Sequence, residues 1–228
     1  AQMKDDLRAT SLLPATEPYQ GMGFTLVGSG GETVPASLLT VTGKNAIVDW
    51  VLVELRNKNN PSQILATKSA LLQRDGDVIG IDGYTRLLFS VAADNYFVAV
   101  RHRNHLGAMT SAAKVLGNTE AGVDFTLATE ATYGTEARCT LANGKRALWS
   151  GNVVTDGVLL YTGQSNDRDP ILEGVGGIVP TNTVSGYSRR DVNLDGLIMY
   201  TGQGNDRDPI LQNIGGVIPT NSRNQQLP

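Results

Sequence analysis

The stretch NAIVDWVLVELRN, residues 45–57, decides the fold class of this sequence. Apolar side chains share its odd-numbered positions, at Ile47, Val51, Val53 and Leu55. Successive side chains of a strand point to opposite faces of a sheet, so the alternation predicts a long strand with a buried face. The turn KNNP (58–61) and the apolar run QILATKSALLQ (63–73) then predict an antiparallel neighbour.

The following part of the chain continues this pattern of short strands and turns. RDGD (74–77) is a turn signal, and three further runs predict strands at 85–91, 95–103 and 122–128. Together they indicate a mainly β fold, and we expect a β-sandwich over residues 34–148. The order of DWVLVEL, an Asp-Gly turn and LLFSVAADNYFVAV resembles transthyretin-type and immunoglobulin-like modules of cell-surface proteins.

Residues 1–33 predict an extended N-terminal arm. Pro14 and Pro18 prevent a long helix, while Leu12, Leu13 and the stretch GFTLVG (23–28) are apolar. An irregular arm of this kind needs a docking surface, and adding a strand to the sheet edge of a neighbour is a common solution. We therefore expect the arm to contact another copy of the chain rather than its own sandwich.

Composition and charge argue against nucleic-acid binding and against a membrane-spanning protein. The formal net charge of −3 gives no electrostatic reason to expect a nucleic-acid partner. No apolar run approaches the roughly eighteen residues that a membrane span needs, so we expect none. Cys139 is the sole cysteine, so an exported chain would need a staple other than an internal disulfide.

Residues 149–228 contain an internal duplication. YTGQSNDRDPIL (161–172) returns as YTGQGNDRDPIL (200–211), and 152–182 matches 191–221 at 19 of 31 positions without a gap. Identity at this level indicates two copies of one small unit. A unit of this size has a small core, so we expect a bound metal to stabilise it and its removal to loosen this region first.

The second copy opens with DVNLDG, which predicts a calcium loop. Asp191, Asn193 and Asp195 stand at alternate positions, Gly196 permits the sharp turn, and the carbonyl of Leu197 adds a further oxygen. A standard loop carries an acid at its twelfth position, where this chain has glycine. We expect Asp206 or Asp208 to close the site instead, although Asp208 before proline also reads as a helix N-cap.

The first copy, NVVTDG, is a weaker version of the same loop. Asn152 replaces the first aspartate, and Val154 removes the side-chain oxygen of the third position. The remaining candidate ligands are Asp156, Asp167 and Asp169. We expect this copy to bind calcium weakly or to hold its shape by packing alone.

The duplicated loop followed by a short helix is similar to dockerin-type modules of extracellular bacterial proteins. The wording DVNLDGLIMYTGQGNDRDPILQNIGGVIPTN (191–221) resembles a C-terminal repeat of large secreted surface proteins of Bacteroidota. FVAVRHRNHLGAMT (97–110) and DDLRATSLLPATEPY (5–19) resemble the same group. The resemblance implies an exported, extracellular or cell-surface protein with bound calcium.

The sequence does not indicate an enzyme. Catalysis needs a nucleophile with a base or paired carboxylates in a pocket, whereas the acids of this chain gather in loops. The two histidines of RHRNH (101–105) lack a third ligand, so we expect them to be solvated rather than bound to zinc.

Two non-enzymatic hypotheses remain. In the first, the chain is a structural subunit that assembles with copies of itself into an extracellular fibre or sheath, which the arm favours. In the second, it is an adhesion or carbohydrate-binding module that contacts surface glycans and docks a partner through its repeat.

Overall fold

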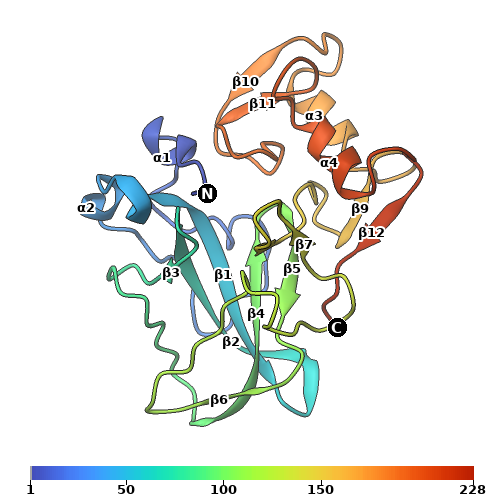
Figure 1. Ribbon diagram of the computed structural model, residues 1–228. Helices are drawn as coiled ribbons and strands as arrows, with labels where there is room; N and C mark the ends of the chain where they lie inside the picture. Colours follow the sequence, from blue (N-terminus) through green and yellow to red (C-terminus); the bar gives the residue numbers. More distant parts are fainter. Residues whose placement is uncertain (1) are drawn as a thin grey trace.

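The computed structural model describes residues 2–228, and the fold is mainly β with antiparallel sheets (Figure 1). The largest sheet has the strand order β3 (Val78–Ile79), β2 (Asn60–Gln73), β1 (Ile47–Asn57), β4 (Asp94–His102) and β5 (His105–Met109), and β6 (Lys114–Leu116) also pairs with β4. The two-stranded sheets join β7 (Cys139–Thr140) to β8 (Arg146–Ala147), β9 (Val158–Leu160) to β12 (Ser222–Asn224), and β10 (Thr183–Ser185) to β11 (Leu197–Met199).

The helices are short. They are α1 (Asp6–Ala9), α2 (Ala36–Leu39), α3 (Asp169–Gly174) and α4 (Arg207–Asn213), with a 3-10 turn η1 at Gly43–Asn45. In the described part of the chain, none of them has the length and apolarity needed to cross a membrane.

Strand β1 is buried on both faces, which explains why most of its residues are apolar, and its charged residues Asp49, Glu54 and Arg56 are buried as well. Trp50 and Leu52 belong to one hydrophobic cluster, and Val53 and Leu55 belong to another. Because neighbouring side chains of a strand point in opposite directions, the two clusters lie on opposite faces of the sheet. The fold therefore needs a cover on each face, which makes it compatible with the predicted β-sandwich.

One face is covered by segments that the sequence predicted to be strands. Residues 85–91 and 122–128 form no strand, so both predictions were wrong. Their apolar side chains Leu87, Phe89, Val91 and Val123 nevertheless pack against the Val53–Leu55 cluster. An alternating apolar pattern indicates that one face of a segment is buried against the sheet. A segment that crosses the sheet buries this face without forming the hydrogen bonds of a paired strand.

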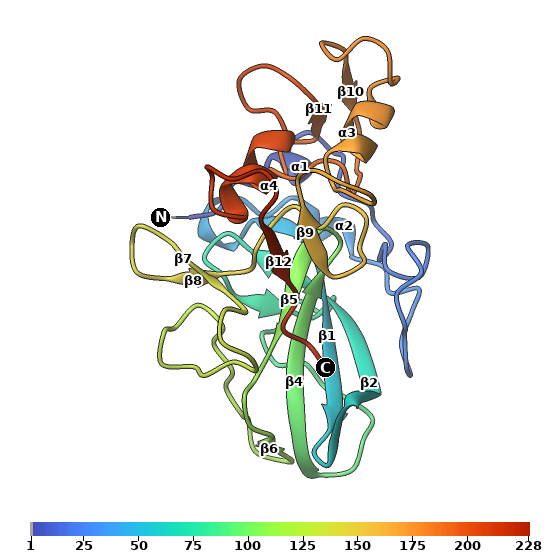
Figure 2. The ribbon, with the colours of Figure 1, turned by 90° about the vertical axis from the view of Figure 1, so that its right-hand side faces the viewer.

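The opposite face is covered by the N-terminal arm, as the two perpendicular views show (Figures 1 and 2). Leu7, Leu13 and Tyr19 are buried in the same cluster as Trp50. The Tyr19 hydroxyl donates to the Trp50 carbonyl at 2.8 Å, and the Trp50 indole donates to the Pro14 carbonyl at 2.9 Å. The arm is part of this chain's own core, and the prediction that it packs on another copy rather than on its own sandwich was wrong.

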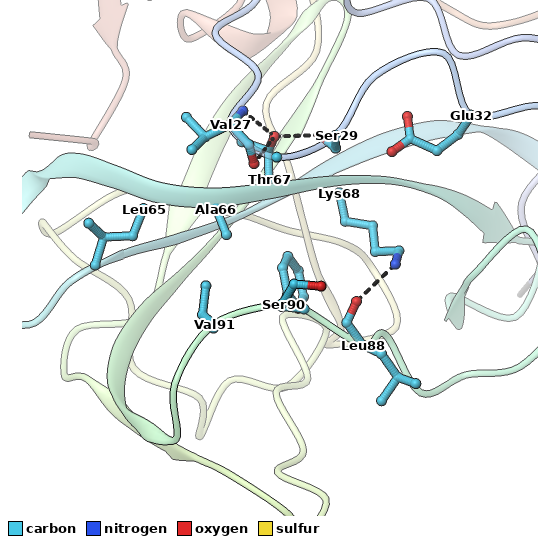
Figure 3. Close-up of a pocket in the computed structure, with 12 residues that line it drawn as sticks. Val27, Ser29, Glu32, Leu65, Ala66, Thr67, Lys68, Leu88, Ser90 and Val91 are labelled. Atoms are coloured by element: carbon cyan, nitrogen blue, oxygen red, sulfur yellow. Dashed lines mark hydrogen bonds between the residues drawn. The ribbon is translucent and has the colours of Figure 1, made fainter.

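The arm also pairs with the edge of its own sheet. The Thr67 amide of β2 donates to the Val27 carbonyl at 2.8 Å, and the Val27 amide donates to the Thr67 hydroxyl at 2.8 Å (Figure 3). The stretch expected to extend a neighbour's sheet therefore covers an edge within the same chain. The physical reason is the apolar face of β1, which needs these side chains for its own burial.

The two repeats exchange their trailing strands. β10 follows the first copy and pairs with β11 of the second, whereas β12 follows the second copy and pairs with β9 of the first. Thr162 donates to the Pro219 carbonyl and Thr201 to the Pro180 carbonyl, both at 2.9 Å. One shared core holds Val153, Ile171 and Val175 from the first copy with Val192, Ile198 and Ile210 from the second.

Candidate metal centre

The second loop (191–196) and the first loop (152–157) have the same backbone conformation. Leu194 and Gly196 have φ angles of 63° and 83°, and their equivalents Thr155 and Gly157 have 63° and 84°. A left-handed residue at these two positions curls each chain tightly, and glycine adopts it without strain. The duplication thus reproduces a specific loop geometry as well as a sequence.

Two fully buried carboxylates shape the second loop. Asp191 accepts the amides of Asp195 and Gly196, at 3.1 and 3.0 Å. Asp206 returns to the loop from beyond its twelfth position and accepts the amides of Val192 and Met199, at 2.7 and 2.9 Å. Asp206 is therefore the acid that closes the loop.

Two further predicted ligands lie on the same loop. The Asn193 amide group donates to Asp195 Oδ2 at 3.0 Å, and Asp195 Oδ1 accepts the Leu197 amide at 2.8 Å. Leu197 begins β11 directly after the turn. The second loop thus carries Asp191, Asn193 and Asp195 on one short curl, Leu197 follows it directly, and Asp206 packs against it.

The structure places Asp208 outside this group. Its carboxylate accepts from the Asn205 side chain at 2.9 Å, lies 3.4 Å from Arg207, and is half exposed. Asp169 has the same role in the first copy, beside Asn166 and Arg168. These contacts give both aspartates a role at the helix entry, and the expectation that they are metal ligands stays a prediction that the contacts do not support.

The helix entry also differs from the prediction. α4 begins at Arg207, so Asp208 lies inside the first turn and is not the N-cap. The Asn205 side chain accepts the amides of Arg207 and Asp208, at 3.1 and 3.0 Å. It satisfies amide groups that a helix start leaves without an internal partner.

The first loop has fewer acidic oxygens. Asp167 is its counterpart of Asp206 and accepts the amides of Val154 and Leu160, at 3.0 and 2.9 Å. Asn152 accepts the Gly157 amide at 3.4 Å, and Asp156 accepts the Val158 amide at 2.9 Å. Backbone hydrogen bonds and packing hold this copy in shape, and it offers two carboxylates where the second copy offers three.

Burial makes the negative charge of both loops costly. It raises the pKa of Asp206 to about 7, and the nearby charge of Asp191 adds to the rise. It raises the pKa of Asp191 to about 6 against the opposing effect of Arg103, and that of Asp167 to about 7. Hydrogen bonds and nearby positive charge both stabilise the ionised form of a buried carboxylate, and a bound cation would supply such a charge.

The donor set of the second loop fits a hard divalent cation. Within residues 2–228, no three His, Cys, Asp or Glu side chains come together as a metal-binding group. The donors of the second loop extend beyond those residue types, because they include the Asn193 amide and the Leu197 carbonyl. Carboxylate, amide and carbonyl oxygens are the ligands that calcium prefers.

A buried arginine fastens the second loop to the main sheet. Arg103 is fully buried, and its guanidinium lies 3.2 Å from Asp49 and 3.6 Å from Asp191. Its plane also lies over the ring of Tyr187, whose hydroxyl donates to Asp49 at 2.7 Å. Burial alone would raise the pKa of Asp49, but Arg103 and the hydrogen bond from His102 hold it at about 2.

The centre of the RHRNH segment is therefore buried, with His102 buried and His105 half-buried, and the expectation of solvated histidines was wrong. His102 contacts Asp49 at 3.0 Å, and the rings of His102 and His105 meet edge-to-face with centroids 4.4 Å apart. Sequence reasoning missed Asp49, Arg103 and Asn104 as site-supporting residues. A charged residue inside the apolar run of β1 was the available signal, because a buried charge needs a partner.

Because the two histidines have lowered pKa values, we expect the free energy of unfolding to depend on pH. Burial lowers the pKa of both, and for His105 the charges of His102 and Arg103 lower it further. Below pH 6.5 the unfolded chain then binds protons that the folded chain does not, so stability falls as the pH falls. In saturating calcium, His105→Gln should make the slope of unfolding free energy between pH 6.5 and 5 shallower, by at most about 1.4 kcal/mol per pH unit, which is the limit for one proton.

This slope is measured by urea unfolding at each pH. Because the comparison is between wild type and one variant, the opposite contribution of the loop aspartates cancels. Equal slopes would mean that His105 titrates in the folded protein as it does in the unfolded chain.

Comparisons with family models, with curated proteins and with solved structures give no match to this chain. The loops and their surroundings are consequently the features from which a function can be inferred.

Proposed function

We propose that the chain is an extracellular, non-enzymatic adhesion or docking module, stabilised by calcium in its second loop. The observation that carries the proposal is the return of Asp206 over the Asp191–Asp195 curl, where two fully buried carboxylates lie together. The duplicated loop-and-helix unit would then be a dockerin-like module of a cell-surface protein. Calcium supplies the positive charge that this site needs, and the chain's own amides orient the carboxylates.

The surface of the repeats supports a docking role. Ile178 and Val217 stand at equivalent positions after the two helices and are 89% and 85% exposed. Their neighbours Val179 and Ile218 are also exposed, so the module presents two matched apolar pairs to solvent. Exposed apolar residues gathered in this way are typical of protein contact surfaces.

The interior supports a non-enzymatic role. His102 contacts the buried Asp49, and His105 packs against His102. Burial raises the pKa of the Cys139 thiol, which weakens it as a nucleophile. Two surface cavities, of about 120 and 230 Å³, are below the usual size of small-molecule sites, which begin at about 300 Å³. A glycan ligand would therefore contact the surface outside these two cavities.

Calorimetric calcium titration tests the proposal. We expect the wild-type protein to bind calcium, Asp195→Ala to lose binding at the second loop, and Asp156→Ala to keep it, because Val154 already deprives the first loop of a ligand. Asp195→Ala should also cost more stability than Asp156→Ala. Equal titration curves for the three proteins would overturn the metal assignment.

Self-assembly into a fibre or sheath is the second candidate. Another copy of the chain is an alternative occupant for the exposed apolar pairs, although the arm no longer favours it. Light scattering behind size exclusion, with and without calcium, separates the two: a monomer at all concentrations supports docking to a different partner, and long particles support assembly.

A further inference from the structure

We propose that Asn104, at the tip of the β4–β5 turn, is a positioning residue for both loops and makes the cation affinity of the second loop depend on the main sheet. The inference rests on the proposed calcium site and extends it to a residue outside the repeats.

Asn104 contacts the first position of each loop. Its carbonyl accepts the amides of Gly151 and Asn152, both at 2.9 Å, where the first loop begins. Its side-chain amide donates to the carbonyls of Arg189 and Asp191, at 2.9 and 2.7 Å, where the second loop begins. Asn152 and Asp191 are equivalent residues of the duplication, so one residue holds the same point of both copies.

The main sheet fixes Asn104 in turn. His102 pairs with His105 across the turn, which leaves Arg103 and Asn104 at its tip. The Asn104 side-chain oxygen lies 2.9 Å from His105 Nδ1, and the residue is fully buried. With its backbone set by the ladder and its side chain engaged at both ends, Asn104 determines where the loops sit.

This placement matters for a cation because Asp191 is both a ligand candidate and an anchored residue. The Asp191 carbonyl is held by Asn104 and its carboxylate lies beside Arg103. Metal–ligand distances tolerate shifts of only about 0.2 Å. Partners that orient ligands from outside the ligand set typically contribute about 10–100-fold to metal affinity.

The test compares Asn104→Asp with Asn221→Asp. Aspartate keeps the shape of asparagine but lacks the amide donor, and Asn221 donates to the Ile214 carbonyl within the same module, away from the loops. In calcium titrations, we expect Asn104→Asp to weaken binding by about tenfold or more. Asn221→Asp should bind as the wild type does, and equal affinities for the two variants would overturn the proposal.

Hydrogen exchange in metal-free protein gives a readout that does not depend on calcium. The amides of Asp195 and Gly196 donate to the Asp191 carboxylate, so they should exchange faster in Asn104→Asp and not in Asn221→Asp. If the wild type binds no calcium, the proposed function fails, while unchanged exchange at these amides would overturn the positioning role by itself. Asn104→Ser, which is smaller and keeps a hydroxyl donor, carries both measurements if Asn104→Asp does not fold.

Discussion

Replacing Asp49 with asparagine should destabilise the protein by about 3–5 kcal/mol, the range found when one partner of a buried ion pair is removed. Asp49 is fully buried and faces Arg103 and His102, at 3.2 and 3.0 Å. Asparagine fills the same space but leaves the buried guanidinium with Asp191 as its remaining carboxylate, at the longer distance of 3.6 Å. Urea unfolding in calcium at pH 7 measures the loss.

Asp94→Asn is the matched control. Asp94 also pairs with a basic residue, Lys58, at 2.6 Å, but both side chains are about two-fifths exposed. A solvated pair of this kind contributes little to stability, because water screens the attraction between its charges. If the Asp49 variant lost no more stability than the Asp94 variant, the buried cluster could not be what joins the loop to the sheet.

Removing calcium should lower the unfolding free energy by about 4 kcal/mol when the free ion had been present at about a thousand times its dissociation constant. The loss should appear in a defined region, which hydrogen exchange with and without chelator can map. Residues 191–206 should lose protection first, because their carboxylates then repel one another in a buried site. The turn at 102–105 should follow, since Arg103 and Asn104 contact Asp191 directly.

Strands β1 and β2 provide the internal control. Their central residues pack between two hydrophobic clusters and are hydrogen-bonded to each other along the sheet. The second loop meets one of these clusters through Leu194, but the ladder does not depend on the loop, so the amides of both strands should remain protected in chelator. Uniform loss along the chain would mean that the repeats and the sheet unfold as one unit. If residues 191–206 lost no protection in chelator, calcium would not be what stabilises this region.

The long strands were predictable from the sequence because their burial is regular. The expected strands at 45–57, 63–73 and 95–103 correspond to β1, β2 and β4. The same alternation failed at 85–91 and 122–128, where it records contact with a sheet rather than membership in one. The prediction for the N-terminal arm failed for a different reason. Apolar residues without periodicity show that a segment must pack against a surface, but they do not show which surface.

The part of the candidate site that depends on residue spacing along the chain was predictable from the sequence. Asp191, Asn193 and Asp195 lie on one curl as the alternate positions required, and Asp206 was one of two alternatives for closing it. The choice between Asp206 and Asp208 depended on the direction of α4, which spacing does not determine. Arg103 and Asn104 lie far from the second loop in the chain, and sheet topology alone brings them to it.

The exchange of trailing strands limits how the two copies can change over evolutionary time. β12 completes the first copy and β10 completes the second, so neither copy can be deleted or replaced without exposing the edge of the other. A substitution that distorts the backbone of one copy therefore also strains the other copy, with whose strand it pairs. The first copy has no side-chain oxygen at Val154, yet it has the same left-handed residues as the second copy and the buried Asp167. Because each copy supports the other, the shape of a loop does not require that both loops carry the same oxygen atoms.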